Sequence, residues 1–402
     1  MPIRQERLDQ WGVCSTPKVW SHDNMSITTP SDEINNEPNK TYPQVWAAYN
    51  QAQTQEKVLF LELLHELTSQ ILQPKRNGAG CPKANLSDMV FSCCLKQYLD
   101  FSSRRSESDM QMVMQLGYIN RTPHFNTILK YLNEPVMKKV LMKLIEISAI
   151  PLKEIESDFA MDASGFSTVM YGNWLAKRLI FNEHKTFKKA HVMCGVKTNI
   201  ITHIEVTDGY SSDRGQVQAL LDGTAKHFHM KEVSADKGYS SEKNLGIILA
   251  HGAIPFVPFI GNVKKTSENR LPIWNIMFRF FRDNKEEFMR HYHKRSNIES
   301  VFSKMKRKFG SHVRGKSTAS QENEVLCKAL CHNLCVLIQE MFELGVKVDF
   351  SEVPATEFMC KAYFNNPFIK KIKPIQTKCR KKRKFHGRET PLRSIDSTDL
   401  GC

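Results

Sequence analysis

The stretch from His291 to Lys306 carries the side chains best suited to chemistry on a phosphate. If it is helical, at about 100° per residue, one face holds the polar side chains at i, i+3, i+7 and i+14, which are Tyr292, Arg295, Glu299 and Lys306. The other side supplies an apolar stripe of Ile298, Val301, Phe302 and Met305. We therefore expect a helix that buries one side and presents a single carboxylate among three groups that can bind phosphate.

Two acids upstream complete a set of three carboxylates. Asp162 ends a predicted strand at 158–164, and Asp236 ends another at 232–236, so both should project into the crevice at the edge of a sheet. Carboxylates are the ligands that hard cations prefer. Two Mg²⁺ or Mn²⁺ ions about 3.5–4 Å apart can activate the attacking oxygen and neutralise the leaving oxygen of a phosphodiester. This chemistry requires no protein nucleophile.

Four other acids are alternatives to this set. Asp158 and Glu205 lie on predicted strands and could face either side, whereas Asp208 suits a turn and Asp213 suits a helix cap. We rank these four below Asp162, Asp236 and Glu299. For the chosen three, the structural alternative is a solvated or capping carboxylate.

The spacing Y-x2-R-x3-E-x6-K, from Tyr292 to Lys306, resembles the signature of insertion-sequence transposases of the DDE class, in the subgroup named after those letters. The run 235–239 resembles the D-x-G-Y motif around the second acid of that family, and 161–164 resembles the surroundings of the first. The acids follow in the right order, 74 and 63 positions apart. The second interval leaves no room for the large β-rich insertion of some relatives, so DNA contacts assigned to that insertion are not transferred.

The resemblance, which covers residues from about 150 to 340, implies a DNA transposase. Its expected steps are binding of inverted-repeat ends, hydrolysis that frees 3′ hydroxyls, and attack of those hydroxyls on target DNA. It implies that Asp162, Asp236 and Glu299 are catalytic and hold two Mg²⁺ or Mn²⁺ ions. Residues implied or expected to contact phosphate are Tyr292, Arg295, Lys306 and Lys237. The expected partner is double-stranded DNA, both transposon ends and target, bound by a homodimer.

Residue chemistry alone supports only a metal-dependent phosphodiester enzyme on a basic scaffold. A related nuclease or an inactive copy therefore stays open as an alternative. So does a non-catalytic DNA-binding regulator, although such a protein would keep the basic surface without needing three acids at these positions.

The chain divides by pattern into four segments. Residues 1–40 are rich in Asn, Ser, Thr, Asp and Pro and are expected to be irregular. Residues 41–150 show helical periods and form a small all-α domain, which we expect to bind DNA ends. Residues 151–345 alternate strands and helices, so the fold class is α/β, and the resemblance implies a ribonuclease-H-like mixed sheet flanked by helices. Residues 346–402 form a C-terminal segment with a basic tail.

The helical domain is expected between 43 and 150, with helices at 43–72, 86–100, 108–116, 124–132 and 134–150. In the catalytic domain, strands are expected at 158–164, 190–197, 200–206, 232–236 and 253–258. Helices at 213–227 and 241–250 precede the signature helix.

Four basic and polar side chains near the start of one predicted helix could reach DNA: Arg121, His124, Asn126 and Lys130. The alternative is that this helical segment only caps the next domain. Cys327, Cys331 and Cys335 lie in an apolar helix, where free cysteines act as small hydrophobic residues rather than zinc ligands. Trp274 is expected to be partly buried rather than stacked on a base.

Composition limits the class of partner. The 402 residues are 41% hydrophobic and 9% aromatic, as in globular proteins. A net charge of +15 attracts large polyanions, of which nucleic acid is the commonest and an anionic membrane surface the alternative. Eleven cysteines without an apolar leader indicate free thiols in a reducing compartment. Because we find no uninterrupted apolar run long enough to span a bilayer, we expect a cytoplasmic, nucleoid-associated protein.

The tail from Lys370 to Arg388 carries ten basic residues and no acidic one. Its densest part is Lys381, Lys382, Arg383 and Lys384. Such a run is expected to contact DNA phosphates without regard to sequence, the alternative being a solvated tail with no defined partner.

Deleting residues 370–402 should weaken binding to any DNA and flatten its salt dependence, because fewer counterions are released on binding. Fluorescence anisotropy of a labelled duplex over a range of salt concentrations measures both effects. A shorter truncation that removes only 389–402, and so keeps the basic run, is the control. An unchanged salt slope in the longer deletion would show that the tail is not an electrostatic contact.

Overall fold

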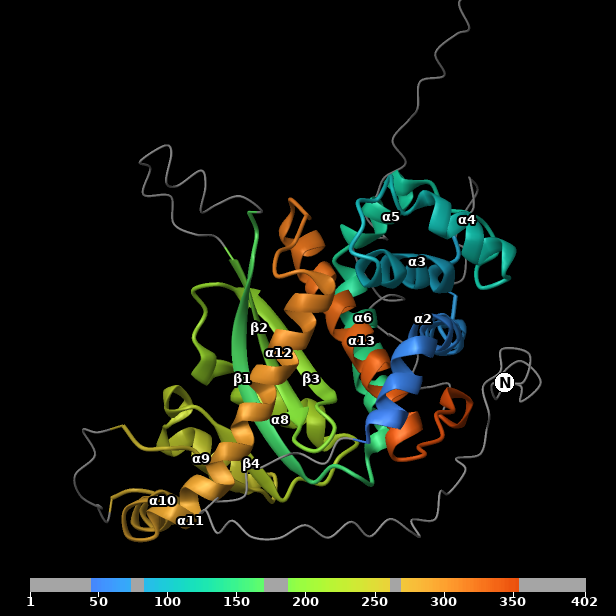
Figure 1. The fold of residues 1–402 in the computed structure, drawn as a ribbon. Coiled ribbons are helices and arrows are strands. Elements are labelled where there is room, and N and C mark those ends of the chain that lie inside the picture. Colours follow the sequence, from blue (N-terminus) through green and yellow to red (C-terminus); the bar gives the residue numbers. More distant parts are fainter. Residues whose placement is uncertain (1–44, 74–82, 170–186, 261–268, 354–402) are drawn as a thin grey trace, which may run out of the picture. The chain divides into compact units, whose positions relative to one another are not determined.

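The computed structural model describes residues 45–73, 83–169, 187–260 and 269–353, all within one unit spanning Met1–Phe364 (Figure 1). The predicted irregular segment 1–40 lies outside the described residues. So does the basic tail with Lys381, Lys382, Arg383 and Lys384.

Each helix predicted between residues 43 and 150 is present. They are α2 (Trp46–Ser69), α3 (Leu86–Tyr98), α4 (Glu107–Gln115), α5 (Phe125–Leu132) and α6 (Val136–Ala149). Side chains cap two of them: Asn85 accepts from the Ser87 N–H at 3.0 Å, and His124 accepts from the Asn126 N–H at 3.2 Å. The helices form because apolar residues recur at helical spacing and become buried, as Leu59, Leu63 and Leu67 do in α2.

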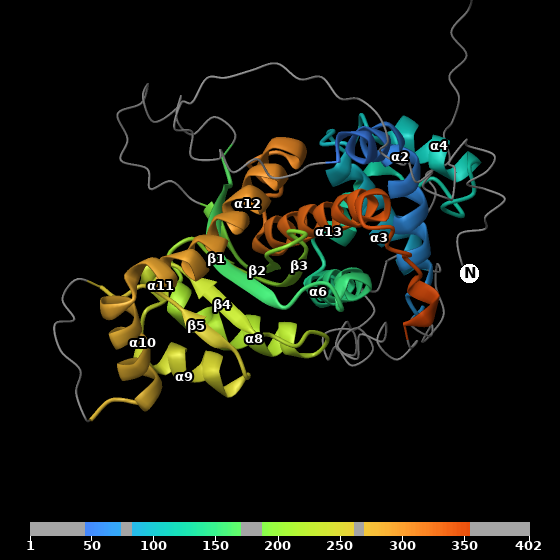
Figure 2. The same ribbon diagram turned by 60° about the horizontal axis from the view of Figure 1, so that its bottom comes forward.

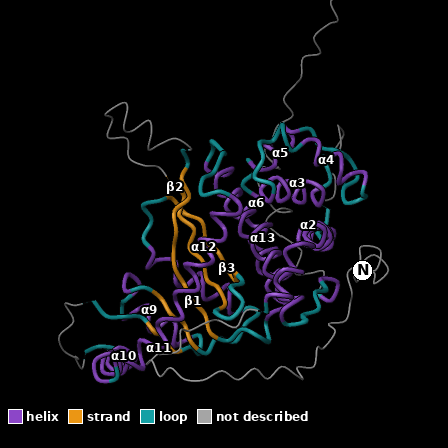
Figure 3. The backbone as a smooth tube through the Cα atoms, in the orientation of Figure 1, coloured by secondary structure: helices purple, strands orange, loops and turns teal. Residues whose placement is uncertain are grey.

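The described strands form one mixed sheet in the order β3-β2-β1-β4-β5 (Figure 3). Their bounds are β1 (Asp158–Ser167), β2 (Phe187–Gly195), β3 (Ile201–Asp208), β4 (Glu232–Ala235) and β5 (Ile254–Phe256). β1, β2 and β3 pair antiparallel, whereas β1, β4 and β5 pair parallel. Asn199 adopts a positive φ of 65° in the turn between β2 and β3, which is the turn that the sequence predicted. The expected α/β class with a mixed sheet is confirmed.

Helices cover both faces of this sheet. In Figure 2, α12 and α13 lie over one face, and α8 and α9 lie over the other. The bounds are α8 (Val217–Ala225), α9 (Glu242–Ala250), α10 (Pro272–Asp283), α11 (Lys285–Tyr292), α12 (Ser296–Phe309) and α13 (Thr318–Glu343). Ser241 caps the start of α9, because its side-chain oxygen accepts a hydrogen bond from the Asn244 N–H. Gly252, with a positive φ of 82°, follows the end of this helix.

The helix α13, the longest of those that follow β1 among the described residues, lies at the centre of the core. It packs against α2, α3 and α6 of the helical segment and also against β3 of the sheet. Cys327 and Cys331 are fully buried in it, and the Cys331 thiol lies 3.3 Å from the Cys94 carbonyl oxygen. The helical segment and the sheet therefore share one core, while the boundaries proposed at residues 41, 151 and 346 stay sequence predictions.

The apolar character of α13 follows from its place in the core. By length and composition alone this helix could cross a membrane, although charged residues, among them Glu324, Lys328 and Glu340, interrupt it, so that it is no uninterrupted apolar run. However, 78% of its most apolar window is buried inside the protein. Packing against α2, α6 and β3 accounts for its apolar character, as in the core helix of a soluble protein.

Asn333 on α13 should be a strong determinant of stability. Its buried amide accepts from the Ile201 N–H at 2.9 Å and donates to the Ile201 carbonyl at 2.8 Å and to Ser148 Oγ at 2.9 Å. Asn333→Ala removes the side-chain partner of both backbone groups of Ile201, at a cost of about 2–4 kcal/mol in the free energy of unfolding. Urea denaturation measures this loss. The control on the same helix is Gln339→Ala, which removes only a bond to Glu343. Equal losses in the two variants would contradict the account.

Candidate active site

The register of two parallel strands brings the first two acids together. β1 and β4 pair from Asp158 with Glu232 through to Met161 with Ala235. Asp162 and Asp236 are the next positions on the two strands, so they stand side by side on the same face. Asp236 directly follows β4, as expected. Asp162, however, is not the end of its strand: β1 continues to Ser167 because it keeps pairing with β2 after β4 has stopped.

The signature helix differs from the continuous helix that the sequence predicted. α11 ends at Tyr292, a 3₁₀ turn (η4) occupies His293–Arg295, and α12 begins at Ser296. In that turn Lys294 Nζ donates to Asp158 Oδ2 at 2.6 Å and to Glu232 Oε2 at 2.7 Å. These bonds hold the turn against the first residues of β1 and β4. These bonds join positions far apart in the chain, so helical periodicity could not predict them or the turn that they hold.

The buried side of α12 is as predicted. Its buried residues include Ile298, Val301, Phe302 and Met305. The helix packs over β1, and the opposite side, with Glu299, stays open to solvent.

Arg295 connects two of the three acids. Its guanidinium donates to Asp162 Oδ2 at 3.0 Å and to Glu299 Oε1 at 2.6 Å. The Arg295 side chain is 17% exposed, and that of Glu299 is 63% exposed. Burial opposes the charge of Arg295, but the bond to Glu299 and the field of Asp162 raise its pKa above the usual value. The carboxylate of α12 is thus joined to the carboxylate of β1.

The electrostatics of Asp162 show that the three acids share one region. Burial raises the pKa of the Asp162 carboxyl, and the fields of Asp236 and Glu299 raise it further. A bond from the Ala163 N–H, at 2.8 Å to Oδ1, and the charge of Arg295 act in the opposite direction. A half-buried acid near two other carboxylates is typical of a functional site rather than of a solvated surface.

Lys306 contacts Ser164, which lies two residues after Asp162 on the same face of β1. Its Nζ donates to Ser164 Oγ at 2.6 Å and lies 5.3 Å from the centre of the Phe166 ring. Burial lowers the pKa of Lys306. Ser164 was not singled out from the sequence, although its place two residues after Asp162 puts it on the same face of the strand.

Tyrosines border the acids on two sides. Tyr292 is half-buried against the core, and burial raises its pKa. Tyr239 is buried with its hydroxyl unpaired, and burial raises its pKa too, as do the fields of Asp162 and Asp236. Tyr239 is therefore a core residue rather than a surface residue.

A cleft of about 400 Å³ opens beside the second acid. Its lining is Asp236, Lys237, Gly238, Phe259 and Ile260. Lys237 is exposed in the 3₁₀ turn (η3, Lys237–Tyr239) that follows Asp236. Trp274, in contrast, is 4% exposed and packs edge-on against Phe259 at 4.7 Å, so the buried interpretation of this residue is confirmed.

The alternative acids have local partners. Asp158 binds Lys294, and Asp208 binds Lys188 at 2.5 Å. Asp213 does not cap a helix as predicted; it begins a 3₁₀ turn (η2, Asp213–Gln216), and its carboxylate lies 2.6 Å from Lys189 Nζ, which holds it against β2 instead. The Oε1 atom of Glu205 lies 3.5 Å from His203 Nε2.

The polar side chains at the start of α5 are exposed. Arg121, Asn126 and Lys130 lie on the surface, and His124 caps the helix. Arg104 joins them, with its guanidinium 5.0 Å from the centre of the Phe125 ring.

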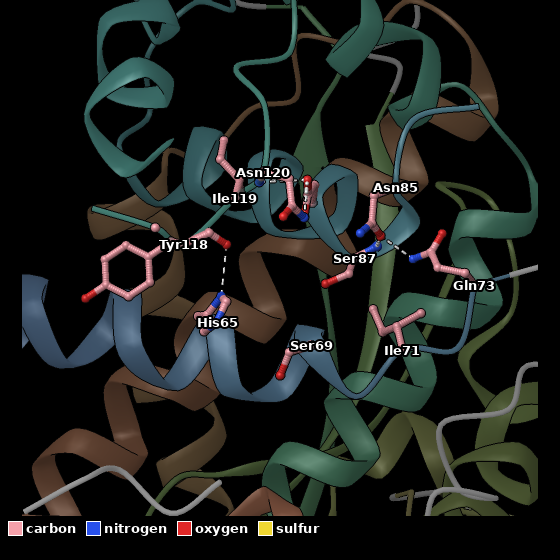
Figure 4. Close-up of a pocket in the computed structure, with 11 residues that line it drawn as sticks. His65, Ser69, Ile71, Gln73, Asn85, Ser87, Tyr118, Ile119 and Asn120 are labelled. Carbon is pink, nitrogen blue, oxygen red and sulfur yellow. Dashed lines mark hydrogen bonds between the residues drawn. The ribbon is translucent and has the colours of Figure 1, made fainter. Parts of the chain in front are cut away.

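A second cleft, of about 230 Å³, lies between the end of α2 and the start of α3 (Figure 4). His65 bonds the Tyr118 carbonyl oxygen there at 2.9 Å, and Asn120 bonds Asp88. None of the three acids lines it.

Comparison with known proteins supports the predicted family. Residues 154–334 match the transposase DDE domain, a stretch that includes Asp162, Asp236 and Glu299. The chain is also 25% identical over 312 residues to the probable transposase for insertion sequence element ISA1214 from Archaeoglobus fulgidus, an alignment that covers 76% of this chain and 91% of that protein. Both matches support the predicted family of insertion-sequence DDE transposases. No solved structure matches it.

These matches support the predicted family, and the observed fold is consistent with a ribonuclease-H-like core. A mixed sheet with helices on both faces is the arrangement observed. The chain carries its three acids on β1, after β4 and on α12. Assignment to the subgroup named after Tyr292, Arg295, Glu299 and Lys306 stays a prediction.

Proposed function

We propose that this DNA transposase binds the inverted-repeat ends of its element and cuts and joins DNA through Asp162, Asp236 and Glu299. The observation that carries the proposal is the arrangement around β1. The parallel register places Asp162 beside Asp236, and Arg295 joins Asp162 to Glu299. A non-catalytic regulator would have no use for three carboxylates brought together from β1, β4 and α12.

The donor chemistry of these acids fits a pair of Mg²⁺ or Mn²⁺ ions, the divalent metals that DDE transposases generally use. All three offer hard carboxylate oxygens, and two of them already bind a cation, the guanidinium of Arg295. When bound, such ions would activate the attacking oxygen and stabilise the leaving one. Among the described residues, no three His, Cys, Asp or Glu side chains are already grouped closely enough to hold one ion.

The remaining residues of the signature would position the DNA backbone. Arg295 has a buried Nε–H without a partner, which a phosphate oxygen could accept. Lys306 stands over Ser164, one outward position beyond Asp162, and Tyr292 borders the same acids. Exposed Lys237 lies on the other side, next to Asp236. A phosphate chain passing along β1 would meet these groups in turn.

The helical segment would bind the transposon end. Arg121, Asn126 and Lys130 are exposed around α5, where basic groups and a helix start both favour phosphate. We further propose that target DNA enters the same catalytic face, that a homodimer forms on the DNA, and that the protein acts in the cytoplasm at the nucleoid. A related nuclease, or an inactive copy, is the alternative.

Asp162→Asn, Asp236→Asn and Glu299→Gln should each abolish Mg²⁺- or Mn²⁺-dependent strand cleavage and leave DNA binding largely intact. The amides keep the shape but lose the charge that holds the ions. Cleavage of a supercoiled plasmid carrying the element, followed on gels, measures the effect. Asp283→Asn is the control, because Asp283 is exposed and pairs only with neighbouring Arg282 among the described residues. Near-normal cleavage in any of the three variants would remove that residue from the triad.

Arg295→Ala and Lys306→Ala should impair formation of a stable complex on the transposon end and lower cleavage with it. Both side chains would fix phosphates, whereas Glu299→Gln should spare the complex and block the cut. Gel-shift and cleavage assays on one set of proteins separate the two effects, and raising the metal concentration should rescue neither basic variant. If Arg295→Ala bound ends normally and lost only cleavage, Arg295 would stabilise the transition state instead.

A further inference from the structure

Asp162 has no oxygen atom free of a hydrogen-bond donor. Oδ1 accepts from the Ala163 N–H at 2.8 Å, and Oδ2 accepts from Arg295 Nη2 at 3.0 Å. The other nitrogen of the same fork, Nη1, bonds Glu299 Oε1 at 2.6 Å. Two of the three acids proposed to hold divalent cations are therefore already paired with one internal cation.

This pairing opposes metal binding in two ways. A cation that uses Asp162 Oδ2 must replace a charge-assisted hydrogen bond that is partly shielded from water, since the Arg295 side chain is 17% exposed. If the guanidinium stayed in place, it would also repel a doubly charged ion a few ångströms away, and this repulsion is weakly screened where the groups are half-buried.

Only the side chain of Arg295 needs to move to release the acids. The preceding residue, Lys294, is held by Asp158 and Glu232 at the starts of β1 and β4, which fixes the backbone of the turn. In its present position the buried Arg295 Nε–H lacks a partner. An incoming phosphate would supply an acceptor for that group and so favour a different placement of the fork.

We propose that Arg295 is an internal counter-ion that competes with divalent cations for Asp162 and Glu299 until a DNA phosphate withdraws it. This inference rests on the proposed metal-binding triad. Its consequence is a positive coupling between the two ligands. Phosphate binding at Arg295 strengthens metal binding, and by linkage metal binding strengthens the hold on phosphate. Metal would then load mainly when DNA is present, which would limit cleavage outside the complex.

The test is the affinity of the full-length protein for Mn²⁺ without DNA, from the electron paramagnetic resonance signal of the free ion. Arg295→Gln should lower the Kd for Mn²⁺ at least tenfold relative to the wild type. Arg307→Gln is the matched control: it removes an equal charge from the adjoining helix, but from an exposed side chain that is not part of the proposed site. It should change the Kd less than threefold. Adding a saturating duplex should tighten Mn²⁺ binding in the wild type and in the control but not in Arg295→Gln, after subtraction of the ion bound by duplex alone.

A Kd in Arg295→Gln equal to or weaker than the wild-type value would overturn the competition. Melting curves identify a variant that has failed to fold, in which case Arg295→Met takes its place. Methionine keeps a long side chain but has neither the charge nor the donors of the guanidinium, so this variant should still bind Mn²⁺ more tightly than the wild type, and no change would contradict the proposal.

Failure of the underlying function would look different. Asp236→Asn leaves the Arg295 contacts in place but removes a proposed ligand, so it should weaken Mn²⁺ binding in both the wild-type and Arg295→Gln backgrounds. If it had no effect in either, the triad itself would be wrong. If it weakened both while Arg295→Gln matched the wild type, only the competition would fail.

Discussion

The face that carries the proposed site depends on the parallel pairing of β1 with β4 in one register. Because side chains alternate along a strand, a slip of one residue would send Asp162 and Asp236 to opposite faces of the sheet. The observed pairing of Met161 with Ala235 prevents this and makes the two acids neighbours. β4 stops there while β1 continues along β2, which leaves the Asp162 edge uncovered on the β4 side. All that α12 then has to supply is a third acid from above the same strand.

The α12 helix is held to β1 at both ends. At the start, Lys294 binds Asp158 and Glu232. At the other end, Ser167 of β1 bonds the segment after α12, and buried Lys328 on α13 donates to the carbonyls of Gly310 and His312 at 2.8 and 2.6 Å. Burial lowers the pKa of Lys328 to about 8. The two carbonyl oxygens therefore stabilise an ammonium group that is largely removed from water. Fixing both ends keeps the Glu299 position constant, as catalysis by positioned carboxylates requires.

Local patterns were enough to predict most elements and the order of the acids. The 3.6-residue period of Ile298, Val301 and Met305 predicted the buried side of α12, and the turn at Asn199 predicted the β2–β3 hairpin. What the patterns missed depends on contacts between distant positions. The 3₁₀ turn before α12 coincides with the bonds of Lys294, and the true end of β1 depends on pairing with β2. The bond between Ser164 and Lys306 spans 142 positions, and α13 joins the helical segment to the sheet in one core.

The central claim is that Asp162, Asp236 and Glu299 together hold the metal ions of this transposase. Anomalous diffraction from crystals of the full chain bound to DNA and Mn²⁺ tests it most directly. The account predicts manganese peaks with oxygens of all three carboxylates at ligand distance, roughly 2.0–2.6 Å, and with the Arg295 guanidinium moved from Asp162 to a phosphate. Manganese bound elsewhere, for example at Asp158 and Glu232 alone, with Arg295 still joining Asp162 to Glu299, would contradict it.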